Sequence, residues 1–203
     1  MTNPTPENPR PDPSELAGYE VVVGVCGGIA AYKVASLVSA LVQRGAGVTV
    51  AMTAAAQKFI TPLTFESLTA RQVFTDLWHS ENYHDPQHLN LTERADMFVI
   101  APATANTIGR IAGGLADDLV STMVMSADCP VLLAPAMNTR MWQNPIVQAN
   151  LKKLVSLGYR MVAPGEGWLA CRTIGAGRMA EPLQILAESI SLLKQSPPRS
   201  KSR

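Results

Sequence analysis

Short apolar runs alternate along the chain with segments whose apolar residues recur every three or four positions. The runs 21–25, 48–52, 97–101, 130–133 and 159–163 are mainly apolar, as expected of strands that are buried on both faces. The segments between them predict amphipathic helices. Because strand–helix alternation favours a parallel sheet covered on both faces, we predict one Rossmann-like or flavodoxin-like α/β domain of three layers.

Glycine and proline mark the ends of the predicted helices. The first helix follows Gly28 and stops at Gly45, and Pro62 opens a short helix at its first turn. A helix that follows Pro102 ends at Gly114. Three more helices are expected, one after Asp118, one from Pro145 to Gly158 and one from Pro182 to Leu193.

Both ends of the chain lie outside this pattern. Residues 1–17 contain five prolines with polar spacers and predict a disordered leader. Residues 194–203 carry proline, lysine and arginine and predict a loose basic tail. The folded domain is therefore expected to span residues 18–193.

Composition narrows the class of protein. Of the 203 residues, 47% are hydrophobic and only 16% are charged, which favours buried contacts between subunits. The net charge of +1 gives no basic field for nucleic acid, and no apolar run approaches the ~20 residues that cross a bilayer. Three scattered cysteines and the lack of a signal-peptide core indicate a reduced compartment. We expect a cytoplasmic enzyme without a metal and without a nucleic-acid or membrane partner.

Candidate chemistry begins where the first predicted strand ends. The turn from Gly24 to Lys33 contains Gly27 and Gly28, and glycines before a helix let backbone N–H groups approach an anion. The turn matches neither a Walker loop nor the GxGxxG motif, and an ordinary tight turn is the alternative. Thr53 follows the second strand, where NAD-binding proteins need an acidic residue, so a mononucleotide phosphate is favoured over NAD.

Two further polar loops follow predicted strands. The loop 104–107 (Thr-Ala-Asn-Thr) offers groups for a phosphate or a flavin ring edge, and helix capping by Thr104 is the alternative. The loop 134–142 presents Asn138, whose amide can donate to a carboxylate without adding charge; a turn-forming asparagine is the alternative. Because the carboxyl ends of parallel strands meet at one edge of a sheet, the three loops together predict a cofactor crevice.

The three histidines lie in a polar segment without a strand pattern. His79 and His84 are expected on the surface, whereas Leu89 and Leu91 would anchor His88 and make it the candidate for catalysis. No cysteine or carboxylate stands beside these histidines at the spacing of zinc ligands, which disfavours a zinc site.

The three cysteines differ in their surroundings. Cys26 and Cys129 adjoin predicted strands and are expected to be packing residues. Cys171 lies in the glycine-rich segment 165–179, for which we predict little secondary structure and the mobility of a flap. Arg172 and Arg178 would lower the pKa of a thiol in this segment, and an unreactive loop cysteine is the alternative.

These motifs occur in a characteristic order. They are the turn 27–33, His-Leu-Asn-Leu at 88–91, Pro-Ala-Thr-Ala-Asn-Thr at 102–107, Pro-Ala-Met-Asn with Met-Trp within 135–142, and Leu-Ala-Cys with Gly-Arg-Met within 169–179. Over residues 21–193 the chain resembles the homo-oligomeric flavin-containing cysteine decarboxylases. It is most similar to those that act on 4'-phosphopantothenoylcysteine in coenzyme A synthesis.

The resemblance implies FMN as cofactor and a homotrimer, sometimes assembled into a dodecamer. It implies a separate ligase that supplies 4'-phosphopantothenoylcysteine. It assigns His88 as a base or orienting group, Asn138 to the substrate carboxylate, and Cys171 as the acid that completes reduction of an enethiol after CO₂ loss. The FMN-binding positions that it implies are Gly27, Gly28, Ile29, Thr53, Phe59, Thr104, Ala105, Asn106, Thr107 and Ala136.

The chain departs from the family pattern in the flap. Family members commonly have Ala-Cys-Gly-Asp there, and this chain has Ala-Cys-Arg-Thr at 170–173. A peptidyl-cysteine decarboxylase would use the same histidine, asparagine and cysteine and is one alternative function. A non-catalytic flavin-binding regulatory subunit is another, although such relatives carry long acidic extensions and this chain has short tails.

Overall fold

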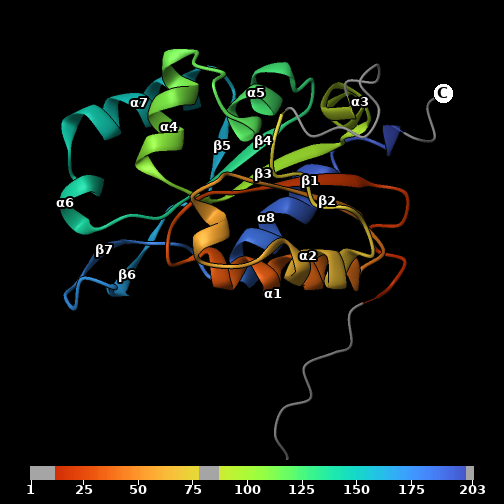
Figure 1. The fold of residues 1–203 in the computed structure, drawn as a ribbon, viewed down its shortest axis with the longest axis horizontal. Helices are drawn as coiled ribbons and strands as arrows, with labels where there is room; N and C mark the ends of the chain where they lie inside the picture. Colours follow the sequence, from red (N-terminus) through yellow and green to blue (C-terminus); the bar gives the residue numbers. More distant parts are fainter. Residues whose placement is uncertain (1–11, 78–86, 200–203) are drawn as a thin grey trace, which may run out of the picture.

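A sheet of five parallel strands in the order β2-β1-β3-β4-β5 forms the centre of the molecule (Figure 1). The computed structural model describes residues 12–77 and 87–199, without the side chains of residues 87–90. The strands are β1 (Glu20–Val25), β2 (Gly47–Met52), β3 (Met97–Ala103), β4 (Val131–Pro135) and β5 (Arg160–Met161). This strand order is that of the flavodoxin-like fold and not of the Rossmann fold, which decides between the two predicted architectures.

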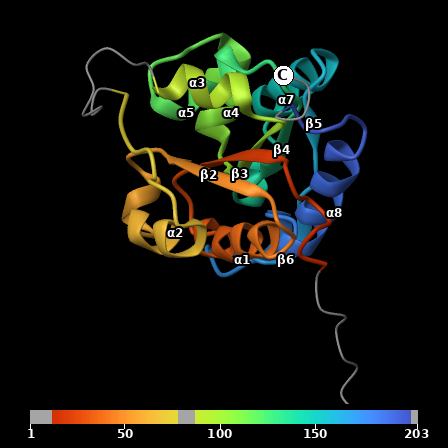
Figure 2. The ribbon, with the colours of Figure 1, turned by 90° about the vertical axis from the view of Figure 1, so that its right-hand side faces the viewer.

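Helices cover both faces of the sheet and complete the three layers (Figures 1 and 2). Helices α1, α2 and α8 pack on one face, and α3, α4, α5 and α7 pack on the other. The helices are α1 (Ala31–Val42), α2 (Pro62–Thr69), α3 (Gln87–Arg94), α4 (Ala105–Gly113), α5 (Leu119–Ser126), α6 (Thr139–Trp142), α7 (Pro145–Ser156) and α8 (Pro182–Leu193), and a 3₁₀ turn, η1 (Ala56–Lys58), follows β2.

The side chains of β1 alternate between the two cores. Val21 and Val23 belong to the cluster that α1 and α8 cover, whereas Val22 belongs to the cluster that α4 and α5 cover. Successive residues of a strand point to opposite faces, so a run that is apolar at every position is buried on both. The predicted strands and helices are present, although β5 has only two residues.

The predicted helix ends have the expected local chemistry. Pro62 occupies the first position of α2, and Gly114 ends α4 with φ of 72°, a left-handed conformation that glycine adopts without strain. Asp118 caps α5, because its Oδ1 accepts a hydrogen bond of 2.7 Å from the backbone N–H of Ser121.

Several elements differ from prediction. Helices α3 and α6 and the turn η1 were not predicted, and the segment expected to have little secondary structure forms an antiparallel hairpin of β6 (Gly165–Trp168) and β7 (Ile174–Arg178). Glycine disfavours strands, and the two strands hold four glycines between them. The hairpin is thus formed by sequences whose local preference is for loops.

The N-terminal boundary also differs from prediction. Leu16 is fully buried in the core, and its backbone N–H donates to the carbonyl oxygen of Arg44 at 2.8 Å. Glu15 pairs with Arg44 at 3.2 Å and with Lys194 at 2.8 Å. Residues 12–17 therefore belong to the folded domain, because one buried leucine and one ion-pairing glutamate outweigh the prolines around them; residues 1–11 lie outside the described part.

The segment after α8 packs on the domain as far as Arg199. The hydroxyl of Tyr19 donates to the carbonyl oxygen of Ser196 at 2.9 Å, and the backbone N–H of Arg199 donates to Asp96 at 2.7 Å. The tail was expected to be loose, but its backbone meets polar groups at the amino ends of β1 and β3. In the segments 12–77 and 87–199, no helix combines the length and apolar character of a membrane span.

Replacing Leu16 with alanine tests whether this residue belongs to the core. We expect Leu16→Ala to lower the free energy of unfolding by about 2–5 kcal/mol, because it deletes a fully buried side chain. Chemical denaturation measures the loss. The matched control is Leu63→Ala on α2, where the leucine is 68% exposed and the change should be small. Equal stability of Leu16→Ala and wild type would contradict the assignment of residues 12–17 to the folded domain and would support the predicted disordered leader.

Candidate active site

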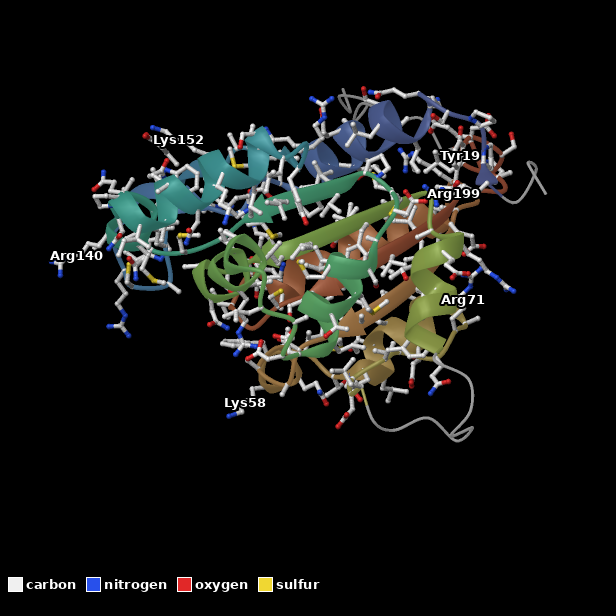
Figure 3. The ribbon with its side chains drawn as sticks, turned by 90° about the horizontal axis from the view of Figure 1, so that it is seen from above. Tyr19, Lys58, Arg71, Arg140, Lys152 and Arg199 are labelled. Atoms are coloured by element: carbon white, nitrogen blue, oxygen red, sulfur yellow. The ribbon has the colours of Figure 1, made fainter. Side chains whose placement is uncertain are left out.

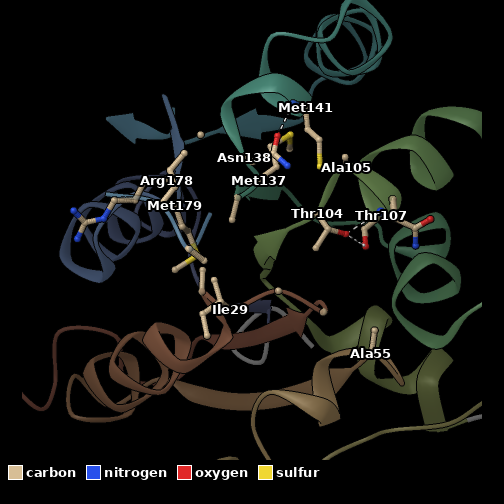
Figure 4. Close-up of a pocket in the computed structure, with 18 of the residues that line it drawn as sticks. Ile29, Ala55, Thr104, Ala105, Thr107, Met137, Asn138, Met141, Arg178 and Met179 are labelled. Carbon is tan, nitrogen blue, oxygen red and sulfur yellow. Dashed lines mark hydrogen bonds between the residues drawn. The ribbon is translucent and has the colours of Figure 1, made fainter. Parts of the chain in front are cut away.

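A cavity of about 1150 Å³ lies at the carboxyl ends of the strands (Figure 4). Its walls come from the loops that follow β1, β2, β3 and β4 and from the β6–β7 hairpin. The strand order reverses between the neighbours β1 and β3: the chain passes from β1 to β2 on one side of β1, and β3 lies on the other side. A crevice opens at such a point, because successive connections leave the sheet in opposite directions.

Two glycines shape the floor of the cavity between these loops. A Cβ atom on Gly27 would overlap the side chain and backbone of Ala55, so the loops after β1 and β2 can meet only at a glycine. A Cβ atom on Gly28 would lie 3.8 Å from Thr104, across the reversal point. Ile29, 55% exposed, and Thr53, whose hydroxyl accepts a hydrogen bond of 3.2 Å from the N–H of Ala56, also line the cavity.

The loop after β3 both caps a helix and lines the cavity. The hydroxyl oxygen of Thr104 accepts from the backbone N–H of Thr107 at 3.2 Å and lies 3.1 Å from the hydroxyl of Thr107 (Figure 4). The capping alternative for Thr104 is therefore correct. The loop residues 104–107 all line the cavity, so the positive end of the α4 dipole is next to it. Capping and ligand binding do not exclude each other here.

Asn138 is oriented by the helix that it caps. Its Oδ1 accepts a hydrogen bond of 2.9 Å from the backbone N–H of Met141, the first contact of α6 (Figure 4). An amide whose oxygen is held in this way keeps its two Nδ2–H donors for another partner. Asn138 lines the cavity, as does Ala136 two residues earlier. The hydrogen bond from the Met141 backbone therefore fixes the orientation of the Asn138 amide, including its Nδ2–H donors.

The hairpin packs against the Asn138 loop through glycine. The backbone N–H of Met137 donates to the carbonyl oxygen of Gly177 at 2.9 Å, and the hydroxyl of Thr139 donates to Ala176 at 2.9 Å. A Cβ atom on Gly177 would overlap the carbonyl of Met137, and one on Gly175 would overlap Thr139. The glycines that weaken the strand pattern of this hairpin in the sequence therefore also allow the hairpin to pack closely beside the cavity.

Cys171 lies in the turn of the hairpin and lines the cavity. Its side chain is exposed, with Sγ 3.1 Å from the hydroxyl oxygen of Thr173. The turn closes through hydrogen bonds of 2.9 Å from Arg172 N to Leu169 O and 2.8 Å from Leu169 N to Thr173 O. Arg172 has φ of 62°, the left-handed region that favours glycine. The family's glycine at this position thus matches the backbone, and this chain holds an arginine in the same conformation.

The other two cysteines behave as the sequence predicts. Burial raises the pKa of Cys26 to about 12 and that of Cys129 to about 11. Both thiols therefore stay protonated and serve as packing groups.

One predicted site residue does not line the cavity, and the side chain of another lies outside the described part of the structure. Phe59 follows η1, is 49% exposed and does not line it. His88 falls in the first turn of α3, and its side chain lies outside the described part of the structure. The other predicted positions all line the cavity: Gly27, Gly28, Ile29, Thr53, Thr104, Ala105, Asn106, Thr107, Ala136, Asn138 and Cys171.

Charged residues that the sequence analysis did not assign to a ligand also line the cavity. Arg110 pairs with Asp118 at 2.7 Å, next to the loop after β3. Lys33 places Nζ 2.9 and 3.0 Å from the two carboxylate oxygens of Glu181, and Arg178 reaches the same carboxylate at 2.8 Å. The hydrogen bond from Lys33, and then the charges of Lys33 and Arg178, hold the pKa of Glu181 below its usual value. The motifs containing Lys33 and Arg178 were visible in the sequence, but their shared partner was not.

Relatives of known sequence and structure share this architecture. The family model described as Flavoprotein matches residues 9–194. The coenzyme A biosynthesis bifunctional protein CoaBC of Bacillus subtilis is 45% identical over 171 residues, which are 84% of this chain and 42% of the relative. The corresponding protein of Escherichia coli K12 is 44% identical over 176 residues, 87% of this chain and 43% of the relative. The chain thus spans less than half the length of these relatives.

Solved structures give the same picture. A PPC decarboxylase variant in complex with pantothenoylaminoethenethiol is 35% identical with a TM-score of 0.78, and the match covers 88% of this chain and 99% of that one. The FMN-dependent cysteine decarboxylase SpaF is 31% identical with a TM-score of 0.75, covering 88% and 97% of the two chains. The predicted resemblance is confirmed, and the chain belongs to the Flavoprotein family.

Proposed function

We propose that this chain is an FMN-dependent decarboxylase that converts 4'-phosphopantothenoylcysteine to 4'-phosphopantetheine in coenzyme A synthesis. The observation that carries the proposal is one cavity that Asn138, Cys171 and the loops after β1 and β3 line together. The similarity to PPC decarboxylase and to proteins of coenzyme A biosynthesis supports the choice of substrate.

The cavity fits FMN. The turn at Gly27 and Gly28 lies at the helix end where a phosphate would accept backbone N–H donors, and Thr53 and Thr104 add hydroxyl groups at its edge. The volume of about 1150 Å³ accommodates a ring system together with a substrate chain. Direct CO₂ loss would leave a carbanion without an electron sink, and FMN supplies a reversible acceptor for the hydride of the thiol-bearing carbon.

Each proposed substrate-handling group has one task. Asn138 donates its Nδ2–H groups to the substrate carboxylate and orients it for departure as CO₂. Cys171 gives a proton to the enethiol carbon that has lost CO₂, while the hydride returns to the neighbouring thiol-bearing carbon. The exposed turn of the hairpin brings the Cys171 thiol to the cavity. His88 acts as base or orienting group in the oxidative half, as the resemblance implies.

A peptidyl-cysteine decarboxylase remains a second candidate, because SpaF is a similar cysteine decarboxylase. Turnover of a peptide with C-terminal cysteine in preference to 4'-phosphopantothenoylcysteine would establish it. Flavin binding without CO₂ release from either substrate would favour the regulatory subunit.

The assembly and setting also belong to the proposal. We place the protein in the cytoplasm as a homotrimer or dodecamer, and exposed apolar side chains such as Ile146 and Ile174 suit contacts between subunits. The ligase that joins cysteine to phosphopantothenate is expected to lie outside these 203 residues.

Replacing Asn138 with aspartate separates substrate binding from helix capping. Aspartate caps α6 equally well but removes the Nδ2–H donors and repels a carboxylate. We expect kcat/KM to fall about 10²-fold or more, with an unchanged melting temperature. Steady-state kinetics and thermal unfolding test this.

The matched control is Asn144→Asp, since Asn144 caps α7 by accepting a hydrogen bond of 2.9 Å from the backbone N–H of Ile146 and does not line the cavity. Its kcat/KM should stay at the wild-type value. Wild-type kinetics for Asn138→Asp would remove Asn138 from substrate binding.

Replacing Cys171 with serine should separate the two halves of the reaction. A hydroxyl is a far weaker acid than a thiol, so CO₂ release should continue while reduction of the enethiol slows by ~10²–10⁴-fold. Mass spectrometry of the products measures the enethiol. Cys129→Ser serves as the control, because Cys129 does not line the cavity. Complete conversion to 4'-phosphopantetheine by Cys171→Ser would refute the proposed acid.

Replacing His88 with asparagine should abolish CO₂ release but leave FMN bound, because the resemblance assigns this histidine to the oxidative half of the reaction and does not include it among the FMN-binding positions. We expect the loss to be ~10²–10⁴-fold. The visible spectrum reports the FMN, and a CO₂ assay reports the reaction. His79→Asn, at a histidine predicted to be on the surface, should react as wild type. Normal CO₂ release by His88→Asn would exclude a catalytic role.

A further inference from the structure

Two cations of the cavity have no part in the chemistry proposed above. Lys33 comes from α1 and Arg178 from β7, and both line the cavity. Both also contact the carboxylate of Glu181, which directly precedes α8. Helix α1 therefore brings one positive charge to a place where Arg178 and Glu181, three residues apart, already pair.

Neighbouring residues hold both cations in position. The side chain of Lys33 is only 12% exposed, and its Nζ bonds both oxygens of Glu181. The side chain of Arg178 passes over Gly167, where a Cβ atom would lie 2.9 Å from Nη1 and 3.2 Å from Cδ. Figure 4 shows Arg178 on the opposite side of the cavity from Thr104 and Thr107. This cation pair is thus separate from the loop after β3.

The pair already binds one anion, the carboxylate of Glu181. One carboxylate balances only one of the two cations, so the group keeps a net charge of +1. The amino end of α8 adds positive potential beside it, where Gln184 accepts a hydrogen bond of 2.9 Å from the N–H of Glu181. A phosphate monoester carries ≈ −1.5 to −2 charges at pH 7 and accepts the paired donors of a guanidinium, so it suits this surplus charge.

We propose that Lys33 and Arg178 form the subsite for the terminal phosphate of the substrate, with Glu181 as the residue that positions both cations. This inference rests on the proposed function, because it takes the substrate to be a phosphorylated pantothenoyl chain. The phosphate is at the opposite end of that chain from the cysteine carboxylate that Asn138 receives. Holding both ends would fix the reacting carbon between them.

A phosphate at this subsite has two possible sources, the substrate and FMN. The structure favours the substrate, because the turn at Gly27 and Gly28 and the Thr104 loop already offer backbone donors and hydroxyls to a flavin phosphate. Arg178 also belongs to the same hairpin as Cys171, so binding the phosphate and placing the proposed acid involve one element.

The test compares two ligands that differ only in the phosphate. Calorimetric titration of the FMN-loaded protein with 4'-phosphopantetheine and with pantetheine gives the two dissociation constants. In Lys33→Gln and in Arg178→Gln we expect the dissociation constant of 4'-phosphopantetheine to rise by about 10- to 100-fold while that of pantetheine changes by less than about 2-fold. Lys33→Arg should recover most of the lost affinity, since it restores the charge.

The matched control is Lys152→Gln. Lys152 is an exposed lysine of α7 that does not line the cavity and projects from the surface in Figure 3. It should bind both ligands as wild type does. Melting temperatures and the FMN absorbance of every variant establish that the fold and the cofactor are retained.

Three results would overturn the inference. One is an equal loss of affinity for both ligands, and another is wild-type affinity for 4'-phosphopantetheine in both variants. The third is a loss of FMN retention with an unchanged preference for the phosphorylated ligand, which would assign the pair to the flavin phosphate. Each can occur while wild type still releases CO₂ from 4'-phosphopantothenoylcysteine, whereas failure of that wild-type reaction would instead refute the proposed function.

Discussion

The contact between β7 and the loop after β4 is the constraint on which the site depends. The hydrogen bond from Met137 to Gly177, and the missing side chain at Gly177, let two backbones approach directly. That approach brings the Cys171 turn over the same cavity that Asn138 lines. The sheet supplies one half of the cavity through its strand-end loops, and the hairpin supplies the other half. Neither half alone would bring Asn138 and Cys171 to one cavity.

Much of the fold could be predicted because its signals are local. No polar residue interrupts β1 from Val21 to Val25, which indicates burial on both faces of the sheet. Pro62 and Gly114 mark helix ends by their backbone preferences. The order of the strands was not local information, so the sequence left Rossmann-like and flavodoxin-like sheets open. The β6–β7 hairpin was missed because glycines that serve its packing also weaken its strand pattern, and the burial of Leu16 was concealed by neighbouring prolines.

The same division applies to the site. Loops that follow parallel strands must meet at one edge of the sheet, and on that basis the positions at Gly28, Thr104 and Asn138 were correctly expected to share a crevice. Phe59 came from the resemblance alone and does not line the cavity. The shared carboxylate of Lys33 and Arg178 could not be predicted, because Lys33 lies 148 residues before Glu181 and meets it only in the folded chain.

The central claim is that this cavity binds FMN and removes CO₂ from a cysteinyl substrate. The most direct measurement is CO₂ release from 4'-phosphopantothenoylcysteine by the purified protein, with its visible spectrum recorded in the same sample. The account predicts a flavin spectrum and one CO₂ for each 4'-phosphopantetheine formed. A colourless protein that cannot be reconstituted with FMN, or a flavin-loaded protein that releases no CO₂, would contradict it.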